Sequence, residues 1–134
     1  MLLADREGTP LGVMVTSASP HEVKLIEPLL EHTQHDLPVQ TRLLYDKAAD
    51  STPLRERLKA RGLRLIAPFI RRRHQRPRRL PKGDQRLYAH RWKIERTFGW
   101  LKHFRRLTTR WEYHPELHLG FWQLACLFTI LRRL

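Results

Sequence analysis

The chain has 134 residues, a length that suits one domain. Its 26 Lys and Arg outnumber its 13 Asp and Glu, and the net charge of +13 excludes an acidic ligand-binding protein and indicates a polyanionic partner. The single cysteine, Cys126, excludes a disulfide framework and a cysteine-based zinc finger.

The chain begins with a predicted β-hairpin. Residues 2–4 and 11–16 are apolar and β-forming, and the turn between them contains Asp5, which we expect to stabilise that turn. Ser19 is the predicted N-cap of a helix over residues 20–33, because a proline follows it and an acid lies three residues on.

A strand, a helix and a second strand follow. Residues 41–45 are the predicted strand, a helix opens at Thr52 and closes at Gly62, and residues 63–66 form the next strand. This order predicts parallel pairing of the two strands.

A run of basic residues comes next. The segment RRRHQRPRRLPKGDQR, residues 71–86, holds eight basic residues and one acid, and Pro81 and Gly83 disfavour a helix within it. We expect a basic loop over residues 70–86 that contacts DNA phosphates, although a solvated loop without a partner has the same composition. The phosphate-binding candidates at its start are Arg71, Arg72 and Arg73.

Two helices complete the predicted order. A long helix covers residues 85–104, and an apolar helix covers residues 117–133. Together the elements predict an α/β fold in which one mixed sheet is flanked by helices, as a single domain over residues 1–134.

The sequence predicts neither secretion nor a membrane partner. The N-terminus lacks a basic segment followed by an apolar one, as a signal peptide requires. The longest apolar stretch, residues 119–131, is short for a membrane span and is interrupted by Gln123. We therefore expect a cytoplasmic protein.

The long predicted helix carries the most informative polar group. At 100° per residue, Tyr88, Arg91, Glu95 and Lys102 fall within a sector of about 60° on one face, beside an apolar stripe that can pack on a sheet. On spacing alone, an ordinary surface ion pair is the preferred interpretation. The combination of one acid, two cations for phosphate and an aromatic ring in a very basic chain favours a functional site.

Asp46 is the second candidate acid. It follows the strand predicted over residues 41–45, at the end where α/β folds place their chemistry. A turn does not require it, because Asp50 or Ser51 can supply one. An acid at a strand end and a Glu on a packed helix can converge on Mg²⁺, and a pair of such ions supports phosphodiester chemistry.

These residues resemble the catalytic domain of bacterial insertion-sequence DDE transposases, which have an RNase H-like fold. The family's signature is a Tyr, an Arg three residues later, the catalytic Glu four residues after that and a Lys seven further on. The segment YAHRWKIERTFGWLK has Tyr88, Arg91, Glu95 and Lys102 at these spacings. The segments LLADREGTPLGVMVT and LLYDKAADSTPLRERLKARG are similar to the family's second and third strands and to the segment with its second catalytic Asp.

The resemblance implies a role for each matching residue. Asp46 and Glu95 would be the second and third catalytic acids and would bind a pair of Mg²⁺ or Mn²⁺ ions. Arg91 and Lys102 would hold DNA phosphates, and Tyr88 would line the site. The implied activity is DNA transposition: hydrolysis at the ends of a mobile element, then attack of the freed 3′-hydroxyl on target DNA. Its partners would be DNA, a second copy on that DNA, or an upstream transposase half, at the nucleoid.

The sequence departs from the family in two ways. The family's first catalytic Asp lies on a strand that precedes the matched segment, so the resemblance implies a partial fold with that first strand missing. Residues 48–50, Ala-Ala-Asp, stand where the family has Gly-Tyr before an Asp. Because two carboxylates coordinate two ions less well than three, we expect the isolated chain to be inactive, as a relic or as half of a frameshifted transposase.

Two other functions fit the charge. A non-catalytic remnant that only binds nucleic acid would use the basic loop and the long helix. An RNA-binding module would carry RNP-like aromatic or GXXG patterns, and the sequence has neither. The tryptophans, Trp111 among them, can stack on bases, but their spacing is more typical of packing.

Overall fold

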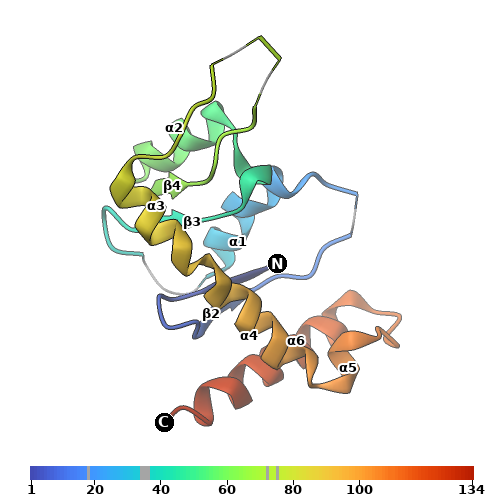
Figure 1. The fold of residues 1–134 in the computed structure, drawn as a ribbon. Coiled ribbons are helices and arrows are strands. Elements are labelled where there is room, and N and C mark those ends of the chain that lie inside the picture. Colours follow the sequence, from blue (N-terminus) through green and yellow to red (C-terminus); the bar gives the residue numbers. More distant parts are fainter. Residues whose placement is uncertain (18, 34–36, 72, 75) are drawn as a thin grey trace. The chain divides into compact units, whose positions relative to one another are not determined.

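The computed structural model describes residues 1–17, 19–33, 37–71, 73–74 and 76–134. They form two compact units: unit one comprises the described residues of 1–35 and 92–134, and unit two those of 36–91. Each unit contains one two-stranded sheet with helices beside it (Figure 1). The α/β class is therefore confirmed, whereas the described residues form two small sheets in place of the one mixed sheet predicted.

Unit one is built on an antiparallel hairpin. Its elements are β1 (Leu2–Ala4), β2 (Pro10–Val13), the 3₁₀ helix η1 (Glu22–Leu25), α1 (Ile26–His32), α4 (Trp92–Lys102), α5 (Arg105–Thr108) and α6 (Pro115–Leu131). None of the helices in the described part of the chain is long and apolar enough to cross a lipid bilayer.

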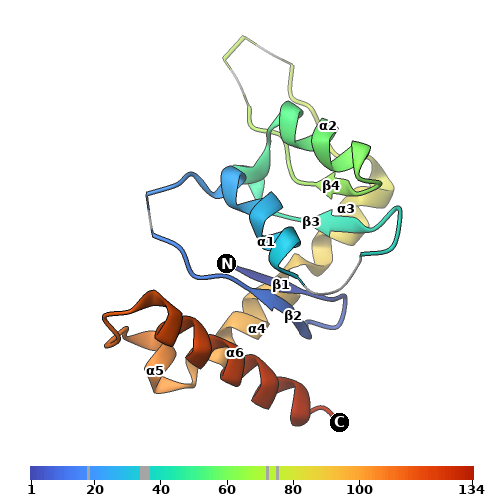
Figure 2. The same cartoon turned by 180° about the vertical axis from the view of Figure 1, so that it is seen from behind.

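The hairpin has helices on both faces. Leu2 pairs with Val13, and both side chains pack into the core formed by α4, α5 and α6. The next pair, Leu3 with Gly12, faces the other side of the hairpin. Because Gly12 has no side chain, Thr33 at the end of α1 can pack against it. Figure 2 shows α1 on one side of the hairpin and α4 and α6 on the other. Because side chains alternate along each strand, one set of hairpin residues contacts α1 and the other set contacts α4 and α6.

The core of unit one also contains the single cysteine. Cys126 is buried on α6 beside Ala125 and near Leu101. Burial raises the pKa of the Cys126 thiol to about 11, so the side chain packs as a neutral, protonated group.

The β1–β2 turn binds α4 through hydrogen bonds. The hydroxyl of Thr97, which is completely buried, donates to the carbonyl oxygen of Gly8 at 2.7 Å, and the Arg96 guanidinium donates to the carbonyl oxygen of Glu7 at 3.1 Å. Within the turn, Oδ1 of Asp5 accepts the backbone N–H groups of Glu7 and Thr9, each at 2.8 Å, which confirms Asp5 as the turn residue. The turn therefore fixes which face of α4 is turned inward.

Unit two is a strand–helix–strand unit followed by a further helix. Its elements are β3 (Arg42–Leu44), the 3₁₀ helix η2 (Lys47–Ala49), α2 (Thr52–Ala60), β4 (Arg64–Ile66), α3 (Lys82–Tyr88) and the 3₁₀ helix η3 (Ala89–Arg91). The two strands pair in parallel, as predicted. Leu54 and Leu58 of α2 are completely buried, and Ser51 caps this helix by accepting the N–H of Leu54.

Apart from shifts of up to three residues at the ends of elements, three predicted features were wrong. His21, rather than Ser19, is the N-cap of the first helical segment, because the backbone at His21 is still extended and its ring nitrogen accepts the N–H of Val23. The helix predicted over residues 85–104 is divided by η3, which tightens the backbone between α3 and α4.

The third difference concerns the end of the basic loop. Helix α3 begins at Lys82, inside the loop predicted over residues 70–86, although Gly83 lies in its first turn. Asp84 explains this, because its buried carboxylate pairs with the guanidinium of Arg64 on β4, 20 residues earlier. A tertiary ion pair here outweighs the local preference of Pro81 and Gly83 for a loop.

Replacing Gly8 tests the docking of the turn. Gly8 has a φ of +81°, and a Cβ there would lie 2.8 Å from Oγ1 of Thr97, so Gly8→Ala should lower the free energy of unfolding by about 1–3 kcal/mol. Gly99→Ala, on α4, is the control, because a Cβ at Gly99 would have no neighbour within 4 Å. This variant should raise the free energy of unfolding by about 0.5–1 kcal/mol. Urea denaturation of both variants measures the difference, and equal stability of the two would contradict the docking.

Candidate active site and basic surface

Asp46 lies at the carboxyl end of β3, as predicted. The backbone N–H of Tyr45 still donates to the carbonyl oxygen of Ile66, so Asp46 follows directly on the last strand contact. Its Oδ1 accepts the N–H of Ala48 at 2.8 Å and caps η2. Asp50 or Ser51 could also have supplied such a turn, and in the structure Asp46 makes it. The side chain is partly exposed, so its carboxylate remains open to solvent.

Asp50 and Arg55 brace the loop that follows Asp46. Oδ1 of Asp50 accepts a bond from the Arg55 guanidinium at 3.2 Å, and its Oδ2 accepts the N–H of Ile70 at 2.7 Å. The same guanidinium donates to the carbonyl oxygens of Leu65 and Ala67 at 2.9 and 2.7 Å. These bonds join the loop after β3 to β4 and to the segment that follows it, and no local sequence pattern indicates them.

Glu95 and Lys102 lie on α4 in unit one. Both side chains are exposed, whereas Thr97 and Leu101 of the same helix are completely buried. Seven residues correspond to 700°, so Glu95 and Lys102 project within about 20° of each other, two turns apart. The predicted helix face is therefore present for these two residues.

Tyr88 and Arg91 lie in unit two, with Asp46. Tyr88 ends α3 and Arg91 ends η3, and both are partly buried. The 3₁₀ helix η3 separates Tyr88 from α4, and the common face of all four signature residues stays a prediction. The convergence of Asp46 with Glu95, which belongs to unit one, stays a prediction.

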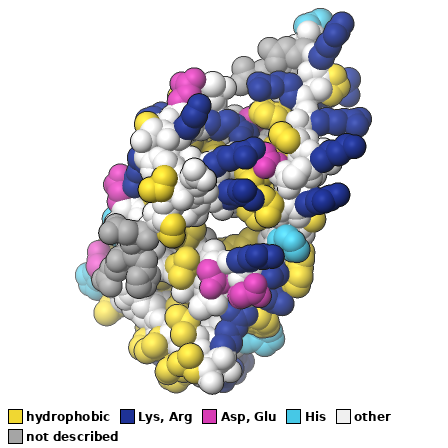
Figure 3. All heavy atoms as spheres, turned by 90° about the vertical axis from the view of Figure 1, so that its left-hand side faces the viewer, with side chains coloured by type: hydrophobic (Ala, Val, Ile, Leu, Met, Phe, Trp, Pro, Cys, Tyr) yellow, Lys and Arg dark blue, Asp and Glu magenta, His cyan; other side chains and the backbone are white. Residues whose placement is uncertain are grey.

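The described residues of the basic loop are exposed from Ile70 to Arg79. Arg71 and Arg73 are exposed, and Arg72 lies outside the described residues. Figure 3 shows Lys and Arg side chains gathered where this loop projects from unit two. The returning part of the loop is held by Arg78, whose guanidinium lies 4.3 Å from the ring centre of Phe69, while Arg55 lies 4.9 Å from it. Sequence analysis missed Phe69, for which the only signal is an aromatic residue beside a basic run.

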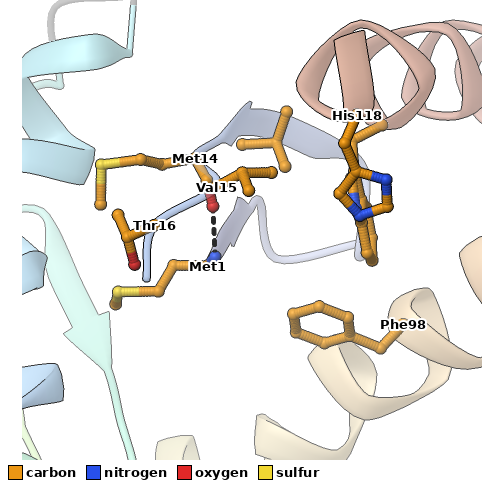
Figure 4. A pocket seen from close by; sticks show the side chains of 8 residues that line it. Met1, Met14, Val15, Thr16, Phe98 and His118 are labelled. Carbon is orange, nitrogen blue, oxygen red and sulfur yellow. Dashed lines mark hydrogen bonds between the residues drawn. The ribbon is translucent and has the colours of Figure 1, made fainter. Parts of the chain in front are cut away.

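A small pocket of about 200 Å³ in unit one does not contain the candidate acids. It lies between the end of the hairpin and α4 and α6, and Met14, Phe98 and His118 line it (Figure 4). His118 is buried and its Nε2 accepts the indole N–H of Trp122 at 3.1 Å, so the ring is engaged in packing. The pocket is therefore separate from the predicted chemistry.

The described residues contain no group of three or more His, Cys, Asp or Glu side chains that could hold a metal ion. Asp46 and Glu95 offer the hard oxygen ligands that Mg²⁺ and Mn²⁺ prefer, one in each unit. The donor chemistry of these two residues fits such an ion, although each contributes only one carboxylate.

Comparison with known proteins decides the family. The family model described as "Transposase DDE domain" matches residues 1–130. The chain belongs to the DDE transposase family. It is 35% identical over 132 residues to the "Putative transposase for insertion sequence element IS402" of Burkholderia cepacia. The alignment covers 93% of this chain and 58% of the relative, so the DDE transposase chain spans a little over half of the relative's length. No solved structure matches it significantly.

The brace beside Asp46 can be tested by Arg55→Lys. A lysine cannot reproduce the bonds of the guanidinium to Asp50, Leu65 and Ala67, so we expect a loss of about 1–3 kcal/mol in the free energy of unfolding. Arg86→Lys, on the exposed side of α3, is the matched control and should change stability by less than about 0.5 kcal/mol. Thermal and urea denaturation measure both, and an unchanged Arg55→Lys variant would exclude the brace.

Proposed function

We propose that this chain supplies the second and third acids of a transposase active site, Asp46 and Glu95, within an RNase H-like catalytic domain over residues 1–134. The reaction is cleavage of DNA at the ends of an insertion sequence, then transfer of the freed 3′-hydroxyl to target DNA. The observation that carries the proposal is the family match over residues 1–130, together with an acid at the end of a parallel strand and an exposed Glu on α4.

Asp46 and Glu95 are proposed as ligands of Mg²⁺ or Mn²⁺ in the assembled site. A pair of such ions, when bound, would supply Lewis-acid activation of water and of a 3′-hydroxyl. The residues of this chain bind and orient the DNA. Arg91 and Lys102 would bind its phosphates, Tyr88 would line the site, and the basic loop with Arg71, Arg72 and Arg73 would hold the flanking duplex.

The 134 residues contain two of the three proposed acids. We propose that the polypeptide of this length does not transfer strands alone and requires the remaining part of a transposase, acting on DNA at the nucleoid in the cytoplasm. A non-catalytic DNA-binding remnant is the second candidate. The net charge of +13 favours DNA binding in either case.

A chimera tests catalysis. The parts of the IS402 relative that flank the matched segment are joined to residues 1–134, and strand transfer is measured with Mg²⁺ and with Mn²⁺. We expect activity in the chimera and a loss of at least about 1000-fold in Asp46→Asn and in Glu95→Gln, because each removes a charged ligand. Glu56→Gln, exposed on α2, is the control and should keep full activity.

The DNA-binding arm of this experiment uses fluorescence anisotropy of a labelled duplex. Asp46→Asn and Glu95→Gln should leave the affinity for the duplex unchanged. The double variant Arg71→Ala with Arg73→Ala should make the slope of log K against log salt concentration shallower by about 2. Retained strand transfer in Glu95→Gln contradicts the catalytic proposal. An inactive chimera that still binds duplex DNA supports the remnant instead, and robust cleavage by the 134-residue polypeptide would overturn its expected inactivity.

We propose further that a second copy binds through the outer face of α6. Leu117, Leu124, Leu127 and Leu131 are each 50–58% exposed, and their spacing of seven, three and four residues is that of a two-helix seam. The helix begins with an acid, Glu116, and an exposed arginine, Arg132, follows its end, so two antiparallel copies bring opposite charges together.

Sedimentation over a concentration series tests this dimer. We expect a dissociation constant on the order of 10 μM, because one helix pair is smaller than the roughly 800 Å² per partner of a standard interface. Leu124→Glu with Leu127→Glu should make the protein monomeric, and Lys59→Glu, exposed on α2, should leave the dimer unchanged. A monomer at all concentrations would exclude this surface as an interface between copies.

A further inference from the structure

The segment between α5 and α6 exposes two aromatic rings. Trp111 is 77% exposed and Tyr113 is 89% exposed, among the highest values of the large apolar residues in the described chain. Tyr and Trp are enriched at binding interfaces, where their rings supply large apolar contact area. We call residues 109–114 the aromatic loop.

The aromatic loop is braced from within by Glu112. The Glu112 side chain is only 7% exposed, and its carboxylate accepts bonds from the Arg106 guanidinium at 2.9 Å and from the N–H of Trp111 at 3.2 Å. The Arg110 guanidinium donates to the carbonyl oxygens of Glu112 and Tyr113, each at 3.0 Å. The residue between the two rings is therefore buried, while the rings on either side of it face solvent.

The brace persists at neutral pH. Burial by itself would raise the pKa of Glu112, but bonds from backbone N–H groups and from Arg106 outweigh it and lower that pKa. The buried ring of His118 adds a further neighbour, with Nδ1 3.5 Å from Oε2 of Glu112. Glu112 thus stays ionised and holds the loop without using the exposed rings.

Two arginines of α5 precede the aromatic loop in the chain. Arg105 is exposed on α5, and the side chain of Arg106 is 63% exposed while it pairs with Glu112. Tyr113 also contacts the ring of His114, with centroids 5.4 Å apart. Flat rings held on a fixed loop beside cations suit a ligand with flat bases and regularly spaced phosphates.

We propose that the aromatic loop binds single-stranded DNA by stacking unpaired nucleobases on Trp111 and Tyr113, with Arg105 and Arg106 at the adjacent phosphates. This site deepens the proposed function and rests on it, since it names unpaired bases of the DNA as a further ligand. The loop adds base contacts to the phosphate contacts of the basic loop, and it needs no sequence preference because every base has a flat face.

The experiment compares three probes of equal length: a dT20 strand, an abasic strand that keeps the phosphates, and a 20-base-pair duplex. We expect Trp111→Ala and Tyr113→Ala each to weaken binding of dT20 by about tenfold and to leave the abasic strand and the duplex unchanged. Trp111→Phe and Tyr113→Phe should keep most of the affinity, because a ring remains. Leu134→Ala, which removes an apolar side chain that is 97% exposed at the C-terminus, is the control and should have no effect.

The outcomes separate this site from the proposed function. If the wild-type protein binds dT20 no better than the abasic strand, the stacking site is excluded. It is also excluded if Trp111→Ala and Tyr113→Ala lower the affinity for all three probes equally. If the duplex still binds in either case, the proposed function stands. A wild-type protein that binds none of the three probes contradicts both. Circular dichroism of each variant confirms that the fold is retained, since both rings project into solvent.

Discussion

The contact between Thr97 and Gly8 determines how unit one is built. It joins the middle of α4 to the tip of the hairpin, 89 residues earlier in the chain, with a buried hydrogen bond of 2.7 Å. Breaking it would leave a buried carbonyl without a partner, which is more costly than the bond is favourable. Because Thr97 must face the turn, Leu101 one turn later faces the core, and Glu95 faces solvent.

The same turn also receives the end of α6. The Arg133 guanidinium donates to Oγ1 of Thr9 at 3.1 Å and to the carbonyl oxygen of Glu7 at 3.2 Å, and it lies 4.6 Å from the ring centre of Trp100. The hairpin tip therefore positions both α4 and α6. This leaves the aromatic loop, which precedes α6, attached at both ends to fixed helices.

In unit two, two ion pairs have the corresponding role, each with a largely buried carboxylate. The Asp50–Arg55 and Arg64–Asp84 pairs connect segments that are five and 20 residues apart. The Asp50–Arg55 pair holds the loop beside Asp46. The Arg64–Asp84 pair stabilises the first turn of α3, the helix that ends at Tyr88. Two ion pairs thus organise the residues around a proposed catalytic acid while leaving that acid for chemistry. Removing the arginine of either pair leaves its carboxylate buried and uncompensated, so such substitutions should destabilise the fold.

The class of fold, the parallel pair of strands and the start of α2 at Thr52 could be predicted from the sequence, because they depend on local periodicity and capping. The position of Asp46 at a strand end could be predicted for the same reason. The family was indicated by a resemblance to its signature, which Tyr88, Arg91, Glu95 and Lys102 match. The structure was needed to show that η3 divides the long helix, that α3 begins inside the basic run, and that Trp111 and Tyr113 are exposed. The start of α3 depends on Arg64, 20 residues before Asp84, and the aromatic loop depends on the buried carboxylate of Glu112. No local pattern encodes such a contact.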